Sequence, residues 1–242
     1  MRVNDVRISN GGVWISEAFA LFRAQPLQWI ALMFAWVLTS LALAVVVPFV
    51  GGAISKILQP AFFAGFMLAC RDQESGKRVT PVHLFAALRV NARALIAIGG
   101  LVLLLEGTLA ISMSALGFQP VFMTGVDLET ASNALRASLE GKGLLLTMST
   151  LIATLIMAIF WFTAPLLAFH RMPAMHAIRW SFFAFFSNIL AMAFFGVLVM
   201  GLMFLSAMSA GLALIVVMPL FMISSFTSYK HVFAESSAES AG

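Results

Sequence analysis

One acidic residue lies inside a long apolar stretch of the chain. Glu106 is the only Asp, Glu, Lys or Arg between positions 94 and 126. It stands about 12 residues into this stretch, or roughly 18 Å along a helix axis. An ionisable group at that depth of a membrane is costly and by default indicates a path for an ion, a proton or a substrate. The alternative is a protonated glutamate that forms a hydrogen bond between helices.

Lys56 is the candidate counter-ion of Glu106. It is expected near the outer end of the preceding apolar segment, where two extended side chains could just meet. The alternative is that Lys56 extends to the membrane interface, as lysines near helix ends commonly do. Gly107, beside Glu106, is expected to allow a close helix approach under either interpretation.

The remaining residues predict no catalytic or metal site. His170 and His176 lack an evident third ligand, and zinc normally has three or four protein ligands. Cys70 is the only cysteine, which excludes an intrachain disulfide and a cysteine-based metal cage. No GxSxG, HExxH, GxGxxG or P-loop pattern occurs in the sequence. We therefore expect neither an enzyme nor a bound cofactor.

The composition places these residues in a membrane. Hydrophobic residues make up 62% of the chain and charged residues 10%, against roughly 25% charged in a soluble domain. Residues 180–229 contain no Asp, Glu, Lys or Arg, and a spanning helix needs about 20 residues. The net charge of +4 comes from short loops between apolar segments. We therefore expect no nucleic-acid partner.

The apolar segments predict an all-α fold, a polytopic transmembrane helical bundle of about six spans. The second span is the weakest, because Lys56, Gln59 and Pro60 interrupt it. A re-entrant segment there would give five spans. With six spans, eleven Lys and Arg residues fall on one side and three on the other, which predicts both termini in the cytoplasm of a bacterium. The six spans are expected at 27–47, 53–70, 94–116, 144–169, 189–207 and 211–228.

Amphipathic segments precede the first, third and fifth spans. Their apolar residues recur at spacings of three and four, with basic residues on the other side. Each such helix could lie in the headgroup plane on the cytoplasmic surface. The basic residues there are expected to contact anionic headgroups. The candidate headgroup contacts are Arg71, Lys77, Arg78, Arg89, Arg93, Arg171 and Arg179.

A proline marks each even-numbered span. Pro60, Pro165 and Pro219 each remove a backbone donor and favour a kink in the helix. The order of interfacial helix, span, turn and proline-bearing span suggests a threefold repeat of 13–70, 81–169 and 173–230 within one transmembrane domain, residues 1–233. A short outer helix is expected within 117–143, and the polar tail 234–242 is expected to be disordered.

Four segments carry a resemblance to known proteins: WISEAFALFRAQPLQW, GFMLACRDQESGKRVTPVHLFAALR, FWFTAPLLAFHRMPAMHAIRWSF and SSFTSYKHVF. The chain resembles a family of six-helix proteobacterial inner-membrane proteins whose function is unassigned. It is more loosely similar to the membrane domain of some glycerophosphodiester phosphodiesterases. The sequence contains no soluble catalytic domain, so that activity does not carry over. The resemblance implies an architecture and no established function.

These observations favour a non-enzymatic inner-membrane protein that binds lipids or a partner in envelope organisation. The expected partners are membrane lipids, with a membrane protein or a second copy of the chain as a further possibility. The alternative is a small transporter or channel that uses Glu106 in the membrane, with the prolines as hinges. That alternative predicts a polar cavity lined by Ser or Thr beside Glu106.

Overall fold

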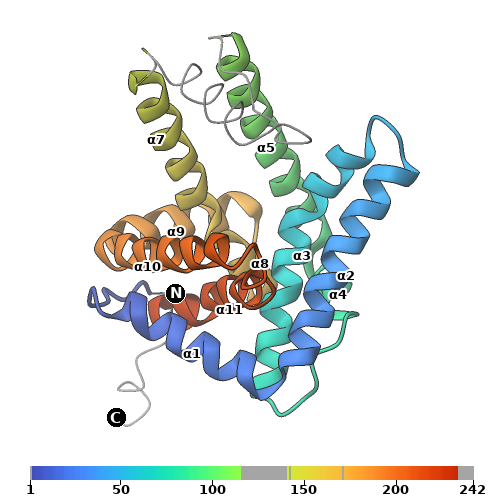
Figure 1. Cartoon of the computed structure of the whole chain (residues 1–242), viewed down its shortest axis with the longest axis vertical. Helices are drawn as coiled ribbons and strands as arrows, with labels where there is room; N and C mark the ends of the chain where they lie inside the picture. Colours follow the sequence, from blue (N-terminus) through green and yellow to red (C-terminus); the bar gives the residue numbers. More distant parts are fainter. Residues whose placement is uncertain (1, 116–140, 142, 171, 234–242) are drawn as a thin grey trace.

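The computed structural model describes residues 2–115, 141, 143–170 and 172–233, and these residues form helices and their connections (Figure 1). No strand occurs among them, so the predicted all-α class is confirmed. The predicted outer helix and the polar tail lie outside the described residues. The helices are α1 (Asn10–Ala24), α2 (Pro26–Val46), α3 (Gly51–Glu74), α4 (His83–Ala86), α5 (Leu88–Ala115), α7 (Gly143–Phe160), α8 (Thr163–Phe169), α9 (Ala174–Ser187), α10 (Ile189–Met208) and α11 (Leu214–Phe233).

Five helices are long and apolar enough to cross a membrane, namely α2, α3, α5, α10 and α11. They coincide with all the predicted spans except the fourth. Helix α3 runs without a break through Lys56, Gln59 and Pro60 to Glu74. The described residues therefore support a polytopic helical bundle in which the second predicted span is one continuous helix.

The fourth predicted span, 144–169, is divided between α7 and α8, with Trp161 and Phe162 in the turn between them. Pro165 has no N–H to donate to the carbonyl of Trp161 four residues earlier, and its ring crowds that carbonyl. The backbone N–H of Phe162 instead donates to Ser181 Oγ at 3.0 Å. The break follows from Pro165, and the count of six spans stays a prediction.

The three proline-bearing helices form the centre of the molecule. Helices α3, α8 and α11 each pack against the other two. The apolar stretches of α3 and α11 are 56% and 61% buried, while those of α2, α5 and α10 are 17%, 22% and 22% buried. The proline-bearing helices are thus enclosed by protein, and α2, α5 and α10 are left with mostly exposed surfaces.

A residue with a side-chain amide interrupts the helix just before α2 and α10 and near the start of α5. Gln25 separates α1 from α2, and Asn188 separates α9 from α10. Asn91 has φ −153° and ψ 56° and bends α5 near its start. Each break lies between an amphipathic segment and a span, where backbone groups lose their helical partners.

The amide of Gln25 binds the chain segment that leads into the second predicted unit. Its Nε2 donates to the carbonyl of Lys77 at 3.0 Å, and its Oε1 accepts from the backbone N–H of Val79 at 2.9 Å. One side chain therefore holds the two polar backbone groups of an extended segment. We call this arrangement an amide clasp.

Asn188 makes the same clasp with the segment that leads into the first unit. Its Nδ2 donates to the carbonyl of Asn4 at 3.0 Å, and its Oδ1 accepts from Val6 N–H at 2.8 Å. Asn91 Nδ2 donates to the carbonyl of Met172, just before the third unit, at 3.3 Å. The three amides thus connect the first unit to the second, the second to the third and the third to the first.

The packing of the amphipathic helices follows the same cyclic order. Helix α1 packs against α11, α4 against α3, and α9 against α7 and α8. Each amphipathic helix thus lies on the proline-bearing helices of the preceding unit. On these contacts we propose that 13–70, 81–169 and 173–230 are three structural copies closed into a ring.

Replacing Asn188 with Ala tests the clasp that closes this ring. The change removes the hydrogen bonds of Asn188 to Asn4 O and from Val6 N–H, and we expect a loss of about 1–3 kcal/mol in the free energy of unfolding. Thermal unfolding in detergent, followed by circular dichroism, measures the change. The matched control is Gln59→Ala, which removes an exposed amide from α3 and is expected to leave the midpoint unchanged. Equal midpoints for the two variants would contradict a structural role for the clasp.

Candidate functional site

The structure brings the two predicted membrane residues together. Lys56 Nζ donates to Glu106 Oε2 at 2.7 Å, and the two side chains are 47% and 41% exposed. The pair joins α3 to α5 on a surface of two predicted spans. Charged groups are costly in such a place, so pairing lowers the cost of burying each in the membrane.

A close approach of α5 to α3 positions this ion pair. A Cβ atom at Gly99 would collide with the backbone of Ile57, so only glycine allows the contact. Glu106 follows Gly99 by seven residues, about two helical turns, and so lies on the same face of α5. The close approach was predicted at Gly107, but a Cβ atom there would meet open space. That prediction was wrong, because Gly107 lies off the α3 contact.

A cavity of about 370 Å³ lies beside the ion pair and is lined by residues of α2, α3, α5, α7, α8 and α11 and by Trp161. Its polar lining groups include Gln59, Glu106 and Thr163. Thr163 Oγ1 already donates to Ile159 O at 2.7 Å, and Trp161 Nε1 donates to Ser228 Oγ at 3.2 Å. The cavity is therefore suited to hydrocarbon and offers few free groups to a hydrated ion.

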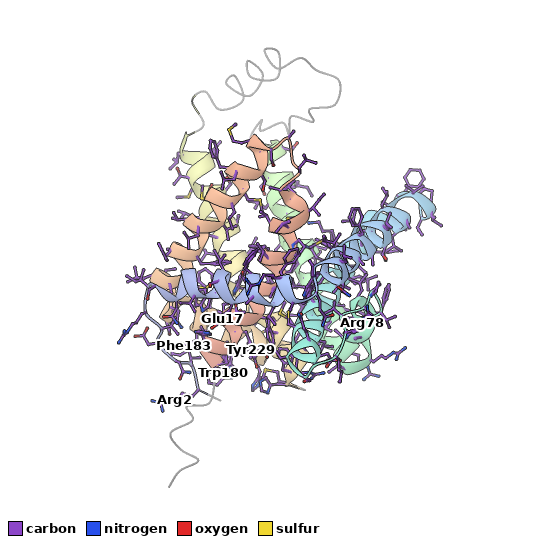
Figure 2. All side chains as sticks on the ribbon, turned by 60° about the horizontal axis from the view of Figure 1, so that its bottom comes forward. Arg2, Glu17, Arg78, Trp180, Phe183 and Tyr229 are labelled. Carbon is purple, nitrogen blue, oxygen red and sulfur yellow. The ribbon has the colours of Figure 1, made fainter. Side chains whose placement is uncertain are left out.

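The candidate headgroup contacts gather at the opposite end of the helices from the α2–α3 turn. We call this region the basic end. In Figure 2 the labelled Arg2 and Arg78 lie in the lower half of the molecule, away from the α2–α3 turn. Arg171 lies outside the described residues. The exposed members of the predicted set are Arg71, Lys77, Arg78, Arg89, Arg93 and Arg179.

Two acidic residues at the basic end were not singled out from the sequence. Asp72 lies 3.4 Å from Lys77 Nζ and 3.5 Å from Arg71 Nη2. Glu74 accepts from Lys230 Nζ at 2.6 Å and so ties the end of α3 to the end of α11. Both acids fall in CRDQE, directly after an apolar segment, which is the only sequence signal for them.

A group of partly exposed polar side chains connects α1 to α11. His231 Nε2 lies 3.0 Å from Glu17 Oε1, and His231 Nδ1 lies 3.1 Å from Asn10 Nδ2. Sequence reasoning missed this group because the residues are more than 200 positions apart. Among the described residues, no three His, Cys, Asp or Glu side chains gather in a way that could hold a metal ion.

The apolar faces of the amphipathic helices are partly buried in the protein core. Trp14, Ala18 and Phe22 of α1 are buried, and α1 packs against α10 and α11. Helix α9 instead leaves Phe182 and Phe183 exposed by 44% and 58%. The prediction that these helices face headgroups therefore concerns only their outer surfaces, since the inner faces belong to the core.

Comparison with known proteins gives one informative match. The chain is 31% identical over 206 residues to a probable inner membrane protein of Burkholderia thailandensis, an alignment that covers 82% of this chain and 75% of the relative. No protein-family model matches the chain. No solved structure matches it.

A double-mutant cycle tests the ion pair. Lys56→Met leaves Glu106 without its partner, and we expect a loss of roughly 1.5–3 kcal/mol in the free energy of unfolding. The double variant Lys56→Met/Glu106→Gln is expected to recover much of this loss, because no unpaired charge remains. Unfolding in a mild detergent is measured for Lys56→Met, for Glu106→Gln and for the double variant. If the double variant loses the sum of the two single losses, the side chains do not interact.

Proposed function

Because the chain belongs to the family of the probable inner membrane protein of Burkholderia thailandensis, it is a multi-pass inner-membrane protein, and we propose that it binds anionic membrane lipids at its basic end without catalysing a reaction. Both termini would face the cytoplasm in this proposal. The bound lipid would serve envelope organisation, either directly or through a partner membrane protein or a second copy of the chain.

The exposure of the basic side chains carries this proposal. All six described candidates are exposed, and the short segment from Arg71 to Arg93 supplies five of them. A Lys or Arg near an anionic membrane surface contributes about 1 kcal/mol of attraction. Asp72 offsets part of the charge of Arg71 and Lys77. Arg78, Arg89 and Arg93 therefore supply the larger share of the attraction.

The first and last described segments of the chain lie together, which supports placing both termini on one side of the membrane. Asn4 N–H donates to Val232 O at 2.8 Å, which places the N-terminal segment beside the end of α11. Both lie with the basic residues, and basic residues of short loops are retained in the cytoplasm.

The alternative of a small transporter has one supporting observation, since Glu106 borders a cavity. That proposal predicts a polar lining of Ser or Thr. The observed lining is largely apolar, and Lys56 already holds the Glu106 carboxylate. Lipid binding therefore agrees better with the geometry.

Removing charge from the basic end tests lipid binding. In Arg78→Gln/Arg89→Gln/Arg93→Gln we expect the preference for anionic over zwitterionic lipid to fall by about tenfold or more, as three attractions of about 1 kcal/mol disappear. Native mass spectrometry from nanodiscs of mixed phosphatidylglycerol and phosphatidylethanolamine measures the retained lipids. The control is Arg78→Lys/Arg89→Lys/Arg93→Lys, which keeps the charge and is expected to keep the preference. An unchanged preference in the Gln variant would rule out this function.

Cysteine labelling tests the orientation. In a Cys70→Ala background, Ser75→Cys at the basic end should react with a membrane-impermeant maleimide only after spheroplasts are permeabilised. Gly52→Cys, at the α2–α3 turn, is the matched control and should react in intact spheroplasts. Both positions are exposed. The reverse pattern would place the basic end outside the cytoplasm.

A further inference from the structure

We propose that the cavity beside Glu106 holds one hydrocarbon chain of a zwitterionic phospholipid, whose headgroup is bound by Lys56 and Glu106. The occupant would come from the surrounding bilayer. The proposal does not rest on the basic end, because none of the exposed basic residues there lines the cavity. It would give the protein a second, structurally distinct lipid site.

The walls of the cavity supply a surface for hydrocarbon. Phe66 and Leu167 are 1% and 0% exposed, and Ile98 is 2% exposed, so their positions are set by packing. On the wall formed by α7 and α8, Ala153 and Ala164 line the cavity with small side chains. Rigid apolar walls around a preformed space are typical of sites for apolar ligands.

The cavity is partly open to its surroundings, so water or bilayer hydrocarbon can enter it. Its 370 Å³ is about a dozen times the roughly 30 Å³ that a water molecule occupies in the liquid. Protein interiors contain few voids larger than one water molecule, since an empty space forfeits dispersion contacts. Water itself would need two to four polar partners for each molecule, and this lining is largely apolar. Hydrocarbon from the bilayer meets these requirements.

The ion pair selects the headgroup. Lys56 lies in the second turn of α3, near the α2–α3 turn, and a long lysine side chain in such a position can extend toward the headgroups. Pro60 also removes the helical donor of the Lys56 carbonyl. A zwitterionic headgroup can place its phosphate on Lys56 and its ammonium on Glu106. An anionic headgroup would meet the repulsion of the Glu106 carboxylate.

The first test fills the cavity. Purified protein in nanodiscs of equal phosphatidylethanolamine and phosphatidylglycerol is stripped with mild detergent and examined by native mass spectrometry. We expect one phosphatidylethanolamine retained by the wild type and about tenfold less in Ala153→Phe, because the new ring displaces several methylenes. The control Ala97→Phe adds the same ring to an exposed position of α5 that does not line the cavity. It should retain the lipid.

Thermal unfolding must show Ala153→Phe to be folded. For a variant that fails this check, Leu109→Phe replaces it, since Leu109 also lines the cavity. No retained lipid in the wild type, or equal retention in folded cavity-filled and wild-type proteins, would overturn the proposal. So would loss of the lipid in Ala97→Phe, because the loss would then not depend on the cavity.

The second test concerns the headgroup. Lys56→Gln/Glu106→Gln replaces the two charged side chains with uncharged amides. We expect it to retain a lipid but to lose the preference for phosphatidylethanolamine, whereas the Gln variants of the basic end should keep that preference in the retained lipid. If Ala153→Phe loses phosphatidylglycerol to the same extent as phosphatidylethanolamine, the assignment of the headgroup is overturned. A loss of the retained phosphatidylethanolamine in the basic-end variants would show that the two sites are not separate.

Discussion

The hydrogen bonding of backbone groups where helices break is the constraint on which this structure depends. A buried backbone N–H or carbonyl without a hydrogen-bond partner is costly, so the backbone groups near each break need one. Gln25, Asn91 and Asn188 supply that partner to extended segments of other units. Each amide therefore fixes which segment of the chain lies next to a change of chain direction. The order of the three amide contacts along the chain agrees with the packing of α1, α4 and α9.

The proline-bearing helices show the same constraint at the centre. Helices α3 and α11 accommodate Pro60 and Pro219 without a break, while Pro165 falls where the helix divides into α7 and α8. At that break Ser181 accepts the N–H of Phe162, which links α9 to the turn. The cavity lies beside this turn, since Trp161 and residues of α7 and α8 are among its lining, and its apolar character follows from the composition of the spans.

Charge is separated along the helices in a way that suits two different lipid contacts. At the basic end, exposed arginines outnumber the acids that neutralise them, which favours anionic surfaces. Near the other end, one Lys and one Glu are paired beside an apolar cavity, which favours a headgroup with both signs. The two arrangements differ in net charge, and so they would select different lipids from one bilayer.

Local patterns were sufficient to predict the helical class and the positions of most apolar helices. They were also sufficient to single out Lys56 and Glu106 as a candidate pair. Hydropathy over about 20 residues and the cost of a charge in lipid need no knowledge of the fold. The sequence also marked Pro60, Pro165 and Pro219, but it did not show that only Pro165 would accompany a break. The partners of Gln25, Asn91 and Asn188 are 52, 81 and 184 residues away, so no local pattern indicates them. Tertiary packing alone decided that Gly99 rather than Gly107 lies against α3, and that the ion pair borders an apolar cavity. The reason is physical: the close approach of two helices depends on which faces their neighbours leave free, and that is a property of the whole bundle.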